Sequence, residues 1–179
     1  FLKKTWLGPI GMGACRMLNI LMGMTAAGAG LSLADSTVHY VVAGGIGIYV
    51  VGITWFARTE ANESHRGQLL ASLLVMLLGM TILAAFPNLL TPNETFVATR
   101  MNVWYAFWSL IALQIIWRCS RAIFQPSPER VQFAVKTCLL SLIVLDATIT
   151  FAVQGQDKAF ILLALLIPTL FLGRFIYST

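Results

Sequence analysis

Long apolar runs separated by short polar connectors make up most of the chain. The runs extend over about Leu7 to Leu31, Val41 to Phe56, Leu69 to Phe86, Met101 to Trp117, Phe133 to Val153 and Ala159 to Leu172. Their lengths, from 14 to 25 residues, lie around the roughly 20 residues that a helix needs to cross a bilayer, and prolines gather in the connectors, where helices end. The pattern predicts an all-α polytopic bundle with about six transmembrane spans.

Composition supports a membrane protein. Hydrophobic residues form 58% of the chain and charged residues only 11%, whereas a soluble domain carries about 25% charged residues. We expect residues 1–179 to be a single transmembrane domain, and the absence of an initiator methionine suggests part of a larger domain.

The basic residues predict the orientation of the spans. If six spans alternate, one side receives eight lysines and arginines (Lys3, Lys4, Arg58, Arg66, Arg118, Arg121, Arg130 and Arg174), and the other receives Arg100 and Lys158. An excess of these residues marks the cytoplasmic face. We therefore predict an integral, multi-pass protein with both chain ends and the connector after the second span in the cytoplasm.

The net charge of +5 follows from the same bias. Basic residues of this kind face anionic lipid headgroups, so no nucleic-acid partner is expected. The three cysteines, Cys15, Cys119 and Cys138, lie toward the predicted cytoplasmic ends of their spans and have no metal-ligand spacing, so neither a disulfide nor a zinc site is expected.

Charged and polar side chains inside the apolar runs are candidate site residues. Arg16 and Asn19 lie three apart on one face of the first run, with Arg16 roughly 15 Å from its start. A guanidinium at that depth costs about 2.5 to 3.5 kcal/mol or more, so it must face a cavity, a carboxylate or a bound anion. Asp146 lies in the fifth run and should point inward, either as a hydrogen-bonded group or as part of a proton or cation site.

Small and aromatic residues suggest how the helices pack. Gly23 with Ala27 and Ala43 with Gly47 form small-xxx-small pairs that allow close approach of two helices. The aromatic residues of the fourth run suit anchoring at a membrane interface: Trp104, Tyr105, Trp108 and Trp117. Tyr105 and Trp108, which share a face, could instead line an apolar lipid groove.

The connector after the second run concentrates ionisable groups. Arg58, Glu60, Glu63, His65 and Arg66 follow one another within nine residues. Two carboxylates three apart lie on one side of a helical turn, where they could share a cation.

The segment Cys15 to Gly23 and the segment Phe56 to Ser64 together resemble the UbiA family of intramembrane prenyltransferases. The resemblance rests on the Arg16-x-x-Asn19-x-x-x-Gly23 helix and on the charged motif that leaves the next helix, which looks like the second Asp-rich motif of that family. It covers about residues 10–70, and the chain would then be the C-terminal two-thirds of such an enzyme. Glu60 and Glu63 stand where the family has aspartates.

The resemblance implies transfer of a polyprenyl group from its diphosphate to an aromatic or other lipophilic acceptor within the membrane. It implies Mg²⁺ held by Glu60 and Glu63, a diphosphate clamped by Arg58, His65 and Arg66, and catalytic roles for Glu60, Glu63, Arg16 and Asn19. Two other classes stay open. A small transporter would also place Arg16 and Asp146 inside a bundle, and a noncatalytic UbiA-like membrane protein would need no site.

Overall fold

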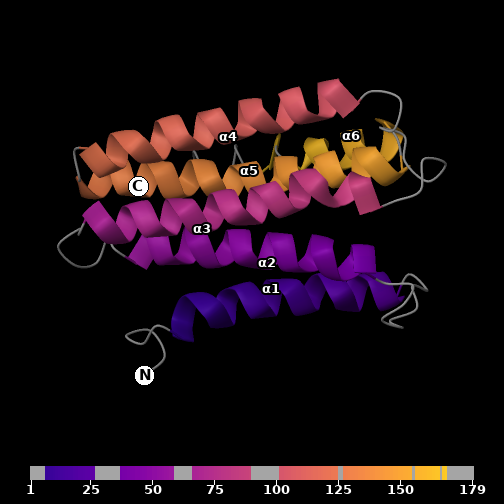
Figure 1. Cartoon of the computed structure of the whole chain (residues 1–179), viewed down its shortest axis with the longest axis horizontal. Coiled ribbons are helices and arrows are strands. Elements are labelled where there is room, and N and C mark those ends of the chain that lie inside the picture. Colours follow the sequence, from indigo (N-terminus) through magenta and orange to yellow (C-terminus); the bar gives the residue numbers. More distant parts are fainter. Residues whose placement is uncertain are drawn as a thin grey trace.

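The chain folds into a bundle of antiparallel helices (Figure 1). The computed structural model describes residues 7–26, 37–58, 66–89, 101–124, 127–154, 156–165 and 167–168. In chain order the elements are α1 (Leu7–Ala26), α2 (Thr37–Arg58), α3 (Arg66–Ala85), the 3₁₀ turn η3 (Phe86–Leu89), α4 (Met101–Phe124), α5 (Pro128–Gln154) and α6 (Gln156–Ala164). The predicted all-helical bundle is confirmed for the described residues.

Three of the described helical segments are long and apolar enough to cross a membrane. They are Thr37–Arg58, Arg66–Leu89 and Glu129–Val153, of 22, 24 and 25 residues. Helix α1, which carries Arg16 and Asn19, and helix α4, which carries Arg118 and Arg121, are not among these three. The protein has the character of a membrane protein, and the count of six spans stays a prediction.

The first three helices pack closely through glycines. A Cβ added to Gly13 of α1 would lie 2.6 Å from the carbonyl oxygen of Gly47 in α2, and a Cβ added to Gly79 of α3 would lie 2.7 Å from the carbonyl oxygen of Gly45. The absence of a side chain at these positions therefore sets the spacing of α1, α2 and α3. The predicted contact role of Gly47 is confirmed, whereas Gly23 faces open space and makes no such contact.

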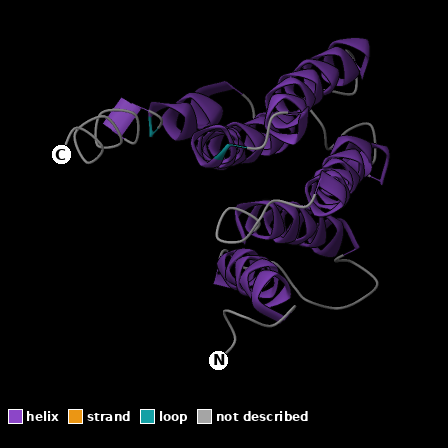
Figure 2. Cartoon of the chain, turned by 90° about the vertical axis from the view of Figure 1, so that its left-hand side faces the viewer, coloured by secondary structure: helices purple, strands orange, loops and turns teal. Residues whose placement is uncertain are grey.

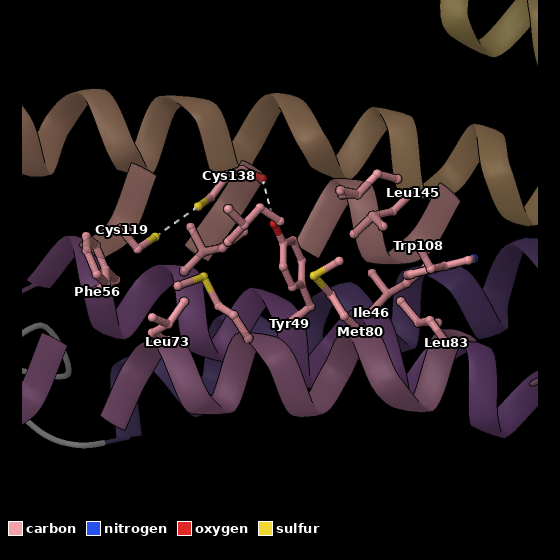
Figure 3. Packing of buried hydrophobic residues seen from close by; sticks show 14 of the residues in the cluster. Ile46, Tyr49, Phe56, Leu73, Met80, Leu83, Trp108, Cys119, Cys138 and Leu145 are labelled. Carbon is pink, nitrogen blue, oxygen red and sulfur yellow. Dashed lines mark hydrogen bonds between the residues drawn. The ribbon is translucent and has the colours of Figure 1, made fainter. Parts of the chain in front are cut away.

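The core lies where α2 and α3 meet α4 and α5, and Figure 3 shows its side chains. Tyr49, Phe56, Leu69, Met76 and Leu83 are its largest fully buried members from α2 and α3. Trp104 and Trp108 are also buried, and the Trp104 indole donates a 2.9 Å hydrogen bond to the Ala84 carbonyl oxygen. These two tryptophans join α4 to α3, so their predicted interfacial role is wrong.

The connector between the fourth and fifth runs is shorter than the sequence pattern predicts. We expected residues 118–130 to lie outside the helices, but α4 continues to Phe124 and α5 begins at Pro128. Proline suits the first turn of a helix, and the Ser127 hydroxyl accepts a hydrogen bond from the Arg130 backbone N–H, which caps α5. The apolar pattern alone stops short because basic side chains occupy these terminal turns.

Candidate functional site

An ion pair joins α1 to α5 in the interior of the apolar helices. The Arg16 Nη2 atom donates to Asp146 Oδ2 at 3.0 Å, across 130 residues of sequence. Arg16 is near the middle of α1, and Asp146 is within the segment of α5 that is apolar enough to cross a membrane. Of the choices that the sequence left open, Arg16 faces a carboxylate, and Asp146 points inward as predicted.

Helix α2 sets the geometry of this pair. Figure 2 shows the helices nearly end-on, with α1 at one edge of the bundle. Gly13 lies against Gly47, so α1 approaches α2 closely at the level where Arg16 extends toward α5. On the α5 side, the Tyr49 hydroxyl lies 2.7 Å from the Ser141 hydroxyl and donates to the Cys138 carbonyl oxygen at 3.2 Å (Figure 3). These contacts hold α5 against α2 one to two turns from Asp146.

The pair is only partly covered by protein. The Arg16 side chain is 39% exposed and the Asp146 side chain 29%, while the Arg16 Nε atom is buried and has no hydrogen-bond partner among the described residues. Asn19, one turn farther along α1, is exposed. Polar side chains near the middle of a membrane helix need hydrogen-bond partners within the protein, because the hydrocarbon of the bilayer provides none.

The arginines on either side of the charged connector lie at a different level of the bundle from the ion pair. Glu60, Glu63 and His65 lie outside the described residues. Arg58 ends α2 and Arg66 begins α3, so they flank the connector at one end of the bundle (Figure 1). Arg66 is exposed and Arg58 half-buried.

Arg16 and Asn19 are far from that end. Gly13 is level with Gly47, and α1 and α2 run antiparallel. Arg16 is three residues beyond Gly13 in one direction, and Arg58 is eleven residues beyond Gly47 in the other. At about 1.5 Å per residue the two arginine backbones are about 20 Å apart along the bundle. The structure thus brings Arg16 together with Asp146 and does not bring it together with Arg58 or Arg66.

The described helices themselves hold no metal centre. Within these residues no group of three or more His, Cys, Asp or Glu side chains is placed to bind a metal ion. The two carboxylates proposed for Mg²⁺ belong to the connector, so their role stays a prediction.

Comparison with protein-family models, with curated proteins and with solved structures gives no match for this chain.

Proposed function

We propose that the protein is an intramembrane prenyltransferase, similar to the UbiA family, that moves a polyprenyl group from its diphosphate to a lipophilic acceptor. The observation that supports it is the charge at one end of the bundle. The ends of α2 and α4 and the starts of α3 and α5 meet there, and each carries at least one arginine: Arg58, Arg66, Arg118, Arg121 and Arg130. A diphosphate has several negative charges and is attracted to such an end.

In this proposal the connector between α2 and α3 binds the diphosphate. Glu60 and Glu63 would hold Mg²⁺, which prefers carboxylate oxygens and would neutralise charge on the leaving group. Arg58 is the last residue of α2 before this connector, and Arg66 is the first residue of α3 after it. Their guanidinium groups, with His65, can donate hydrogen bonds to phosphate oxygens. The apolar bundle keeps water from the reactive prenyl group.

Arg16 and Asn19 then lie too deep to clamp the diphosphate. The Arg16–Asp146 pair instead fixes α1 against α5 about 20 Å farther into the bundle. Asn19 is exposed on the same helix, where it could meet the acceptor.

The test is magnesium-dependent prenyl transfer by the purified protein in lipid nanodiscs. Glu60→Gln and Glu63→Gln should each lower the rate at least about a hundredfold, because the metal loses a charged ligand. Glu129→Gln is the matched control, since Glu129 is an exposed glutamate at the same end of the bundle, in the first turn of α5. Equal rates in all three variants would refute the metal role of the connector.

One observation favours a second candidate, a proton-coupled transporter. An arginine of α1 forms an ion pair with an aspartate of α5, a helix long and apolar enough to cross a membrane, and proton relays use intramembrane charged groups of this kind. The test is proton uptake by vesicles that contain the protein and a trapped pH dye. A flux that depends on the protein and disappears in Asp146→Asn would favour the transporter, and no flux would reject it.

A further inference from the structure

Two arginines and two aromatic rings form a cluster where α4 ends and α5 begins. The Arg118 Cζ atom lies 5.0 Å from the ring centroid of Trp117 and 4.9 Å from that of Phe133. The Arg121 Cζ atom lies 4.0 Å from the centroid of the same Trp117 ring. One indole therefore contacts two guanidinium groups, and we name these four side chains the α4–α5 cluster.

The two arginines of the cluster have no counter-charge among the described residues. Neither Arg118 nor Arg121 forms an ion pair with a described residue, and the buried Arg118 Nε atom has no hydrogen-bond partner there. A cation–π contact is worth about 0.5 to 1 kcal/mol at an exposed site, which does not replace a counter-charge for two like charges at one ring. The remaining N–H groups of both arginines are donors suited to a phosphate.

The position of the cluster indicates that the phosphate belongs to a lipid headgroup. Trp117 is seven residues from the end of α4, which is about 10 Å from the helix end. Trp117 and Phe133 are about half exposed, and Leu110 and Leu113 continue the exposed apolar face along α4. Half-exposed aromatic rings beside basic groups are typical of the headgroup level of a bilayer. Both a phosphate and an acyl chain therefore find matching surfaces here.

We propose that the α4–α5 cluster binds the phosphate of an anionic phospholipid, with its acyl chain along Leu113 and Leu110. The residues of this site belong to α4 and α5, whereas Glu60 and Glu63 belong to the connector after α2, and lipid binding here needs no prenyl transfer. A zwitterionic lipid is disfavoured because its ammonium group would approach two uncompensated guanidinium groups.

The experiment measures binding of dihexanoyl phosphatidylglycerol to the delipidated protein in a mild nonionic detergent, by titration calorimetry. The wild type should bind it saturably and bind dihexanoyl phosphatidylcholine at least about tenfold more weakly. Arg118→Gln with Arg121→Gln should weaken phosphatidylglycerol binding by about tenfold or more, because charge-assisted hydrogen bonds are lost. Lys158→Gln, which removes an exposed positive charge at the start of α6, should leave it unchanged.

Arg121→Gln alone covers the case in which the double variant does not fold. Arg121 is exposed and contacts only Trp117 in the cluster, so this variant should fold and still bind phosphatidylglycerol more weakly. Three results would overturn the proposal: equal binding of the two lipids, unchanged binding in a folded variant of the cluster, or full competition by an equal concentration of inorganic pyrophosphate. The last would identify a site for a soluble anion.

Discussion

Removing either partner of the Arg16–Asp146 pair should destabilise the protein more than removing both. The test uses Arg16→Met, Asp146→Leu and the double variant. Each single variant leaves one charge without its partner among apolar helices, whereas the double variant leaves none.

The expected loss of stability follows from the distance between the two charges and from the exposed fractions of the two side chains. Opposite charges about 4 Å apart attract by about 4 kcal/mol at an effective dielectric constant of 20. Loss of one partner of a buried pair costs about 3 to 5 kcal/mol. With 39% and 29% of the side chains exposed, we expect about 2 to 3 kcal/mol for each single variant and less than about 1 kcal/mol for the double variant. The coupling energy should thus be at least about 3 kcal/mol.

The assay is unfolding by SDS in mixed micelles, followed by tryptophan fluorescence. Trp104 and Trp108 are suitable reporters because both are buried between α3 and α4. Asn19→Leu is the control on the same helix, and its exposed side chain should change the free energy of unfolding by less than about 0.5 kcal/mol. A coupling energy below about 0.6 kcal/mol, the average for a hydrogen bond between membrane helices, would show that the pair does not hold α1 to α5.

Two further predictions concern packing and orientation. Gly79→Ala should lower the free energy of unfolding by about 1 to 3 kcal/mol, because its Cβ would lie 2.7 Å from backbone atoms of Gly45 and Tyr49, and Gly44→Ala is a control with nothing within 4 Å; equal stability of the two variants would contradict the packing. Single cysteines at positions 62 and 93, in a background without Cys15, Cys119 and Cys138, should react with an impermeant label from opposite sides of the membrane, the first only in permeabilised cells. Labelling of both from outside intact cells would reverse the predicted orientation.

The helical character of the chain could be predicted because long apolar runs leave few alternatives. All six runs overlap described helices, but the helix ends differ because caps such as Ser127 and basic terminal turns do not register in an apolar pattern. The direction in which a side chain faces was harder to predict. Gly47 packs against α1 while Gly23 faces open space, since a helix that is apolar on every side does not reveal which face meets protein. Trp104 and Trp108 were assigned to the interface for the same reason.

The sequence predicts that Arg16 and Asp146 each need a partner, but it does not identify that partner. A guanidinium and a carboxylate deep in apolar runs each require a partner, so the sequence predicts that both point inward. It does not say that they meet, because the pairing depends on how α1 and α5 are aligned against α2. That alignment comes from Gly13 against Gly47 and from the Tyr49 hydroxyl beside Ser141. Contacts between residues so distant in sequence leave no local pattern.

The separation of Arg16 from Arg58 makes the two candidate functions distinguishable. A diphosphate site at the connector would depend on Glu60 and Glu63, and the ion pair, about 20 Å from Arg58 along the bundle, would affect it only through the position of α1. Asp146→Asn should then lower stability but leave magnesium dependence intact in whatever protein stays folded. In a proton-coupled transporter the same substitution abolishes flux even in fully folded protein, because the titrating group itself is gone. Activity measured per folded molecule therefore separates an ion pair that holds helices together from one that moves protons.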